Sequence, residues 1–305
     1  MSTPLPDDVR ATLTTLLAPI ALDDFVALHY ERAPLHLRAA GRAPLLTRDV
    51  LLSTLRAQRT VPRGVMLFPE HFDGGAHTAD ALVADASRLD AYLADGHPLI
   101  WNAPRGRFPA LDRVCEALAL AFGAHAWVNV YDTGLAGTAF ATHFDAHEVF
   151  ALHCEGRKHW KLSRVRADRP LDDEAMRATN ARWMTLRAEE AARDTLSAFE
   201  VSPGDVVYIP RGTFHDAMAV AGRSLHVTFG VAAWTGRDLC LALAERCLDD
   251  PSLRTYAPPP FADPDGARTV AWLHDALARI GEHLLDDALF EQLSATRRTP
   301  PGVTR

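Results

Sequence analysis

Residues 204–215 have the sequence GDVVYIPRGTFH, in which a short apolar run lies between two turn-forming segments. The apolar run, Val206–Ile209, has the length and the β-branched content of a buried strand. Pro203 and Gly204 precede it, and a Pro-Arg-Gly turn follows it. A further strand is expected from His215 to Val220. The stretch therefore predicts two short strands separated by a tight turn.

Similar strands are expected throughout residues 126–231. They are Ala126–Tyr131, Phe140–Asp145, Val149–Cys154, Lys158–Leu162, Leu196–Val201 and Leu225–Val231. Antiparallel strands at this density predict a barrel or a double-sheet jelly roll. If the strands that begin at His215 and Leu225 form a hairpin, His226 and Thr228 lie near His215. A polar, helix-prone insertion at 165–195 fits a lid over the barrel mouth and a plain surface insertion equally well.

Helices and a few short strands are expected on both sides of this region. The predicted helices are residues 7–19, Leu22–Glu31, Arg48–Ala57 with Thr47 as N-cap, Thr78–Ala94, Phe108–Phe122, Gly236–Leu248 with Thr235 as N-cap, and one or two helices within Gly266–Leu293. The predicted strands are Leu35–Arg38, Gly64–Phe68 and Pro98–Trp101. The chain therefore reads as mainly β with flanking helices and a C-terminal helical region.

Two regions follow from this pattern. Residues 1–235 are expected to form one catalytic domain with an α/β elaboration at its N-terminal end and a barrel core at about 98–235. Residues 236–305 are expected to form a helical tail. An exposed tail with apolar stripes is a candidate dimerisation module, and packing onto its own barrel is the alternative.

Three residues in the strand region can form one metal site. His143 and Asp145 are two positions apart, so alternation along a strand puts both side chains on one face. His215 comes from a later strand. Two imidazoles and one carboxylate form the facial triad that binds Fe(II) and leaves positions open for a co-substrate and dioxygen. The set predicts a non-haem iron oxygenase.

Other interpretations of these residues remain open. His143 and Asp145 could be a polar pair on a strand with His215 as a core histidine, or the barrel could have lost its metal site. His147, four positions after His143, would suit a zinc site only on a helix. In a strand region we expect His147 to be a rim or substrate-facing residue.

Composition limits the partners and the compartment. The net charge is −7 and the pI is about 6.0, which argues against direct nucleic-acid binding. No apolar run approaches the roughly 18 residues of a membrane span, and residues 1–8 do not resemble a secretion signal. The four scattered cysteines have no Cys-x-x-Cys pairing. We therefore expect a reduced, cytoplasmic protein without a membrane partner.

Five segments together resemble a known family. They are HFD at 143–145, GRKHW at 156–160, GDVVYIPRG at 204–212 followed by His215, SLHVT at 224–228, and YERAPLHLR at 30–38. In this order and at this spacing they resemble the JmjC-type cupin oxygenases, and within them the ribosomal oxygenase branch, also called the cupin-4 group. The resemblance covers residues 20–235.

The resemblance implies a double-stranded β-helix that uses Fe(II), with 2-oxoglutarate and O2 as co-substrates. It implies His143, Asp145 and His215 as metal ligands, Lys158 as the residue that binds the far carboxylate of 2-oxoglutarate, and Asn129 as a lining residue of the same pocket. A dicarboxylate that chelates iron at one end needs a buried cation at the other, so these roles are physically sensible. The chain departs from the family at His153, where glutamine is frequent.

The implied activity is hydroxylation of an amino-acid side chain in a protein or peptide, with histidine or arginine of a ribosomal protein as the family precedent. Demethylation of an N-methyl group is chemically available to the same site. A natural-product peptide or a small metabolite is an alternative substrate. A metal-only cupin enzyme, which would not need Lys158, and a non-catalytic binding module, which would tolerate loss of His143 and Asp145, are the remaining alternatives. Structural roles are expected for Tyr131, His153 and Trp160, and a structural hydrogen bond for His226.

Overall fold

The computed structural model of the 305-residue chain describes residues 4–39, 41–57, 64–67, 97–134, 141–220 and 222–284. The chain forms two units: Met1–Phe122 with Ala126–Ala232, and Gly123–His125 with Ala233–Arg305. The predicted helix Thr78–Ala94 lies outside the described residues, as does the part of Gly266–Leu293 that follows residue 284.

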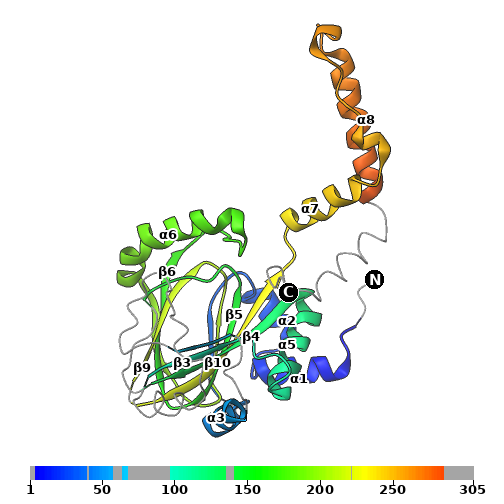
Figure 1. Ribbon diagram of the computed structural model, residues 1–305. Coiled ribbons are helices and arrows are strands. Elements are labelled where there is room, and N and C mark those ends of the chain that lie inside the picture. The colour runs from blue at the N-terminus through cyan, green and yellow to red at the C-terminus, as the bar shows by residue number, and fades with distance from the viewer. Residues whose placement is uncertain are drawn as a thin grey trace. The chain divides into compact units, whose positions relative to one another are not determined.

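Two β-sheets form the centre of the first unit (Figure 1). The larger sheet has the order β1-β8-β5-β10-β4-β3-β2, and the smaller has the order β7-β6-β9. The strands are β1 Leu35–Leu37, β2 Val65–Leu67, β3 Leu99–Asn102, β4 Ala124–Thr133, β5 Glu148–Glu155, β6 Lys158–Arg166, β7 Thr195–Val201, β8 Val206–Ile209, β9 Thr213–Ala219 and β10 Ser224–Ala233. Neighbours such as β5–β8, β5–β10 and β6–β9 are antiparallel. The prediction of a mainly β, double-sheet cupin fold is confirmed.

An apolar layer joins the inner faces of the two sheets. Val149, Ala151, Val207 and Ile209 from β5 and β8 pack with Trp160, Leu162 and Val201 from β6 and β7. The neighbouring residues on β5 and β8 point the other way, and β5 is buried along nearly its whole length. Strands covered on both faces lack the simple alternation of buried and exposed residues.

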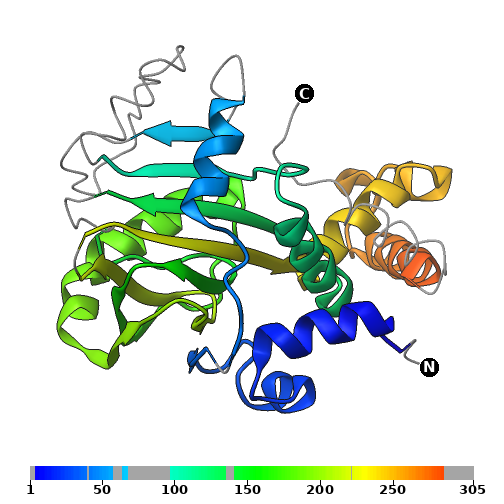
Figure 2. The same cartoon turned by 90° about the horizontal axis from the view of Figure 1, so that it is seen from below.

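Helices cover the outer face of the larger sheet (Figure 2). They are α1 Asp7–Leu17, α2 Leu22–Leu28 and α5 Pro109–Phe122, with α3 Arg48–Arg56 at one end. Phe25 of α2 is fully buried against the rings of Phe150 and Tyr208, with centroid distances of 5.6 and 4.7 Å. The predicted N-cap Thr47 is confirmed, because its side chain accepts a hydrogen bond from the Val50 amide.

The structure corrects two expectations about the strands near the candidate site. Within the described part of the predicted strand Phe140–Asp145, His143 forms one isolated bridge with His215 and no ladder follows. The condition that would bring His226 and Thr228 near His215, a hairpin of these two strands, is also not met, since the strands that contain His215 and His226 belong to different sheets. β9 pairs with β6, and β10 pairs with β5.

The helix-prone insertion contains α6, Glu174–Arg193, which contacts β6 and β9 and lies next to β6 in Figure 1. Trp183 and Met184 of α6 pack against a buried cluster that includes Phe144 and Phe214. Phe144 lies between His143 and Asp145, so α6 supports the segment that carries two of the predicted metal ligands.

The second unit contains α7 Gly236–Cys247, the 3-10 turns Pro251–Arg254 and Pro260–Ala262, and α8 Ala267–Leu284. Thr235 and Asp238 form a reciprocal capping box at the start of α7, as the sequence predicts for Thr235. In the part of the chain that the structure describes, no single helix is long and apolar enough to cross a membrane. The bent pair α1–α2 together has the length and composition of a span, and nothing beyond length and composition supports one.

Candidate metal centre and its neighbouring pocket

The structure brings His143, Asp145 and His215 together. Their candidate ligand atoms all lie within 4.8 Å of one another, and Nε2 of His215 is 3.5 Å from Oδ2 of Asp145. Adjacent ligands about 2.1 Å from a metal are about 3 Å apart, so a small closure of the three side chains would complete a site. The triad joins an irregular segment, residues 141–147, to the start of β9.

Backbone carbonyls orient both imidazoles toward a common point. Nδ1 of His143 is 2.9 Å from the Ala141 carbonyl, and Nδ1 of His215 is 2.9 Å from the Thr213 carbonyl. A carbonyl can only accept, so Nδ1 carries the proton in each ring and the lone pair lies on Nε2. Hydrogen bonds of this kind commonly orient metal-binding histidines.

The charge state of the set also suits a divalent metal. Burial acts to raise the pKa of Asp145, but His147, His143 and His215 outweigh it and the net shift is downward. Burial and the neighbouring His143 lower the pKa of His215 to about 4. An anionic carboxylate and a neutral His215 imidazole result, and together with the His143 imidazole they make up the donor set of the facial triad. The residues present therefore fit Fe(II).

The triad is open on one side. The His215 side chain is 5% exposed, whereas that of Asp145 is 31% exposed. His147 lies near Asp145, and its ring packs edge-on against Trp127 at 4.5 Å. Residues 143–147 contain no helix, so the helical zinc alternative for His143 and His147 does not apply. His147 and Trp127 are positioned at the open side of the site.

Lys158 lies deeper in the same barrel. The turn before it requires glycine, since Gly156 has φ +70° and a Cβ there would lie 2.2 Å from the Arg223 carbonyl. Leu162 faces His215 across the β6–β9 ladder, and Lys158 is four residues before Leu162. The two levels are about 13 Å apart along the strand, a gap that a lysine stem and a five-carbon dicarboxylate can fill together.

The Lys158 amine is buried rather than solvated. The residue is 4% exposed, and Nζ lies 3.0 Å from Nδ1 of His226. Burial lowers the pKa of Lys158 to about 7, although the Asp132 carboxylate acts to raise it. Lys158 is therefore not a solvated hairpin residue.

Aromatic rings connect the Lys158 level with the triad. The Trp160 ring has its centroid 6.0 Å from those of both His215 and His226. Tyr131 stacks on His226 at 4.6 Å. Asn129 is a side-chain hydrogen-bond partner of Tyr131, and its Oδ1 accepts from the Ala103 amide at 3.2 Å. Asn129 thus lies on the wall, and part of its hydrogen-bonding capacity serves the backbone.

Two residues of this wall were assigned no co-substrate role in the sequence analysis. His226 is the partner of the Lys158 amine, and Tyr131 lies between His226 and Asn129. The sequence did contain a signal for Tyr131. Asn129 and Tyr131 are two residues apart, so they lie on the same face of β4. The predicted structural hydrogen bond of His226 is confirmed, and its partner is Lys158.

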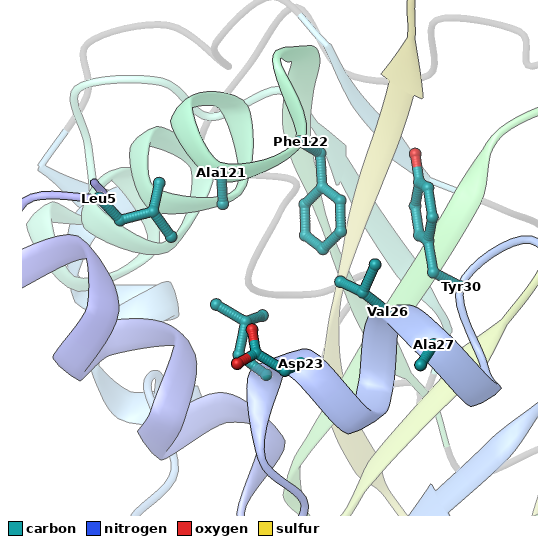
Figure 3. Close-up of a pocket in the computed structure, with 8 residues that line it drawn as sticks. Leu5, Asp23, Val26, Ala27, Tyr30, Ala121 and Phe122 are labelled. Atoms are coloured by element: carbon teal, nitrogen blue, oxygen red, sulfur yellow. The ribbon is translucent and has the colours of Figure 1, made fainter. Parts of the chain in front are cut away.

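A separate cavity of about 460 Å³ lies between the N-terminal helices and α5 (Figure 3). Its lining is mostly apolar and includes Val26, Ala121 and Phe122, with the Asp23 carboxylate at one wall. None of the candidate metal or pocket residues borders it. It therefore adds nothing to the site described above.

Comparison with known proteins agrees with this geometry. Residues 103–239 match the family model described as JmjC domain. Residues 103–239 are a JmjC domain. This domain places the chain among the JmjC-type cupins, near the ribosomal oxygenase branch.

Relatives of the JmjC-domain chain include two groups of curated proteins. The "Bifunctional lysine-specific demethylase and histidyl-hydroxylase NO66" of Aedes aegypti is 27% identical over 228 residues, which are 73% of this chain and 35% of that protein. "Ribosomal oxygenase 2" of Mus musculus is 34% identical over 240 residues, which are 73% of this chain and 47% of that protein. The chain thus spans less than half the length of these curated relatives.

A solved structure shares the fold. It is YcfD, described as a ribosomal oxygenase from Escherichia coli in complex with cobalt and 2-oxoglutarate. The TM-score is 0.60 at 17% identity, with 94% of this chain and 75% of that chain covered.

Proposed function

We propose that this chain is an Fe(II)- and 2-oxoglutarate-dependent oxygenase that hydroxylates an amino-acid side chain in a protein or peptide. The observation that carries the proposal is the pairing of two features in one barrel. His143, Asp145 and His215 converge on the open side, and the buried Lys158 lies on β6 four residues from Leu162, the residue opposite His215. The names of the JmjC relatives and the cobalt and 2-oxoglutarate bound to YcfD support it.

Each residue has a defined task in this proposal. His143, Asp145 and His215 hold the metal through Nε2, a carboxylate oxygen and Nε2. Lys158 binds the far carboxylate of 2-oxoglutarate, and Asn129 lines that pocket. Bound Fe(II), with 2-oxoglutarate and O2, supplies the oxidation that inserts one oxygen atom into a C–H bond and leaves succinate and carbon dioxide.

The barrel also controls what reaches this chemistry. Trp160, Val149 and Ile209 belong to an apolar layer that excludes water from the space beneath the triad. The partly exposed Asp145 and the neighbouring His147 leave the other side accessible. A side chain presented on a polypeptide can enter from that side.

The substrate we favour is a ribosomal protein, with histidine or arginine as the hydroxylated residue. The support is the pair of relatives named as a histidyl-hydroxylase and a ribosomal oxygenase. The test incubates the purified protein with Fe(II), 2-oxoglutarate, O2 and ribosomal proteins from its own cells, followed by peptide mass spectrometry. We expect one protein to gain one oxygen atom at a single side chain, and no gain with Asp145→Ala. Turnover of 2-oxoglutarate without any modified ribosomal protein would move the proposal to another peptide or to a small metabolite.

We also propose a homodimer formed through the C-terminal helices. Val270, Leu273 and Leu277 make an exposed apolar stripe on α8, and Leu241 and Leu248 are exposed on or beside α7. Stripes of this kind usually become buried on association. Leu273→Glu with Leu277→Glu should yield a monomer by light scattering, whereas Leu186→Glu on α6 should not. An unchanged dimer, or a monomeric wild type, would remove the proposal.

A cytoplasmic location completes the proposal. Cys115, Cys154, Cys240 and Cys247 are all present as free thiols, which supports a reducing compartment.

A further inference from the structure

The Lys158 amine has an unusual partner for a buried cation. Nζ donates to Nδ1 of His226, a neutral base, at 3.0 Å. Among the described residues no carboxylate lies within ion-pairing distance of Nζ. Buried ammonium groups are normally paired with an acid, because an isolated charge is costly to bury.

The groups around Nζ explain why no acid is available. Asp132 on β4 is the carboxylate that acts on the charge of Lys158, but it forms no ion pair with Nζ, and its buried oxygen Oδ2 accepts from Nε of Arg48 at 2.8 Å. Two imidazoles also lie near the amine, His226 on β10 and His153 on β5. The charge of Lys158 contributes to lowering the pKa of both.

Among the residues that the structure describes, the remaining elements around Lys158 contribute no charge. Val201 on β7 and Ala219 on β9 face it across the smaller sheet. The Tyr131 hydroxyl on β4 stays protonated because burial raises its pKa. The amine therefore faces two neutral bases, apolar side chains and one carboxylate that is paired with Arg48 rather than with Nζ.

We propose that Lys158 and His226 form a receptor for the co-substrate carboxylate that takes up one proton when the carboxylate binds, with His226 positioning the amine. The inference rests on the proposed function, since it concerns how 2-oxoglutarate is held. The proton comes from solvent and ends on Nζ of Lys158, and no bond of the carboxylate is broken. His226 holds Nζ through Nδ1, so a neutral His226 carries its own proton on Nε2.

Charge and burial agree with this proton movement. Burial lowers the pKa of Lys158 to about 7, so at pH 8 the unliganded amine is mostly neutral. An incoming carboxylate replaces the missing acid and favours the charged amine. Above pH 7, binding must include a proton, and affinity for 2-oxoglutarate should fall about tenfold for each pH unit.

The experiment is anaerobic calorimetric titration of the Fe(II)-loaded full chain with 2-oxoglutarate, at pH 6 and pH 8, in buffers with different ionisation heats. At pH 8 the observed heat should vary between buffers in proportion to the uptake of close to one proton. At pH 6, where the amine is already charged, the dependence should be small. The affinity should be about tenfold weaker at pH 8 than at pH 6.

Lys158→Arg is the matched control for the site of protonation. A guanidinium can pair with the carboxylate but is charged at both pH values. The variant should retain binding and lose both the buffer dependence at pH 8 and the pH dependence of affinity. Persistence of the full proton uptake in Lys158→Arg would place the proton elsewhere, for example on the metal-binding histidines, and would overturn the inference.

Two substitutions of His226 test its positioning role. His226→Asn keeps an acceptor oxygen near the place of Nδ1, whereas His226→Phe keeps a ring that can stack on Tyr131 and has no acceptor. We expect the dissociation constant of 2-oxoglutarate to rise about threefold or less in His226→Asn and tenfold or more in His226→Phe. Equal binding of 2-oxoglutarate by both variants would show that His226 only fills space and does not position the amine.

The outcomes separate this inference from the proposed function. No binding of 2-oxoglutarate by the wild type would overturn the proposed function, and the inference with it. Tight binding with a heat that does not depend on the buffer at pH 8 would overturn the inference alone. The wild-type titration decides this without any variant, so a variant that fails to fold does not affect the decision.

Discussion

At the scale of single residues, Lys158 is a residue kept at a cost to stability. Its pKa of about 7 lies below the ordinary value of 10.5, so between these values the unfolded chain binds more protons than the folded chain. The free energy of unfolding contributed by this group therefore increases as the pH rises from 7 to 10.5. Without its ligand, the folded protein is penalised most below that window.

Lys158→Met should therefore stabilise the metal-free, unliganded protein. Met fills a similar volume without a charge, and we expect a gain of about 1–4 kcal/mol at pH 7 that shrinks as the pH approaches 10. Urea unfolding of both proteins at pH 7 and pH 9.5 measures the two differences. A variant less stable than wild type at pH 7 would mean that the amine is already compensated in the unliganded fold.

Gly230 makes a second residue-scale prediction. A Cβ at this position would lie 2.4 Å from Cε2 of Trp127, a ring that also contacts His147 at the open side of the triad. Gly230→Ala must displace the indole and should destabilise the protein by about 1–3 kcal/mol. Adding Trp127→Leu should recover part of that loss in thermal unfolding, because the two changes share one space. Strict additivity would show that the clash is relieved elsewhere.

At the scale of elements, turn residues and apolar runs predicted most of the strands correctly. Val206–Ile209 is a strand at the predicted residues, since Pro and Gly bound it on both sides. The segment around His143 was predicted as a strand. Side chains point to alternate sides along any extended backbone, whether or not that backbone pairs with a neighbouring strand. Within the described residues 141–145 the segment forms an isolated bridge between His143 and His215 and no ladder, and alternation still puts both ligands on one side with Phe144 on the other.

The pairing of β9 and β10 was not predictable for a different reason. A short turn between two strands favours a hairpin, but it does not specify which sheet each strand joins. β9 instead continues the smaller sheet beside β6, which puts Leu162 opposite His215. The position of Lys158 relative to the triad follows from the pairing of β9 with β6. It could therefore not be predicted from the spacing of these residues in the sequence.

The support that α6 gives to the ligand segment can be tested with Phe144. This ring is 4% exposed and packs edge-on against Phe214 at 5.0 Å, in the cluster that Trp183 of α6 contacts. Phe144→Ala should cost about 3–5 kcal/mol of stability and weaken Fe(II) binding, because the residues on either side are both ligands. Trp183→Ala should weaken Fe(II) binding to a smaller degree.

Leu186→Ala is the control for α6, since this residue is on the same helix and 66% exposed. Iron affinity measured by competition with a chelator should be unchanged in that variant. If Phe144→Ala binds iron as tightly as wild type, the segment that carries His143 and Asp145 is held by its backbone hydrogen bonds rather than by the apolar cluster around Phe144.

At the scale of the whole molecule, buried neutral histidines predict sensitivity to acid. Burial lowers the pKa of His153 and His215 to about 4, and that of His226 lies well below its usual 6.5. The unfolded chain takes up these protons at about pH 6.5 and the folded chain does not. The stability of the metal-free protein should fall between pH 6.5 and pH 4, by on the order of 1 kcal/mol per pH unit for each histidine.

His153→Gln isolates one part of this effect. Nε2 of His153 donates a hydrogen bond to the Gly156 carbonyl at 2.9 Å, and the side-chain amide of glutamine can donate the same bond without titrating in this range. The variant should show a shallower loss of melting temperature between pH 6.5 and pH 4. An unchanged slope would show that His153 is already neutral in the unfolded chain or accessible to protons in the folded one.

The measurement that tests the central claim most directly is anaerobic titration of the whole protein with Fe(II) and then 2-oxoglutarate, followed by visible absorption. We predict a weak metal-to-ligand charge-transfer band in the wild type, its loss in His143→Ala and its weakening in Lys158→Ala. Bound iron without the band would contradict a 2-oxoglutarate enzyme and favour a metal-only cupin. Absence of bound iron would contradict the metal centre itself and leave a binding module.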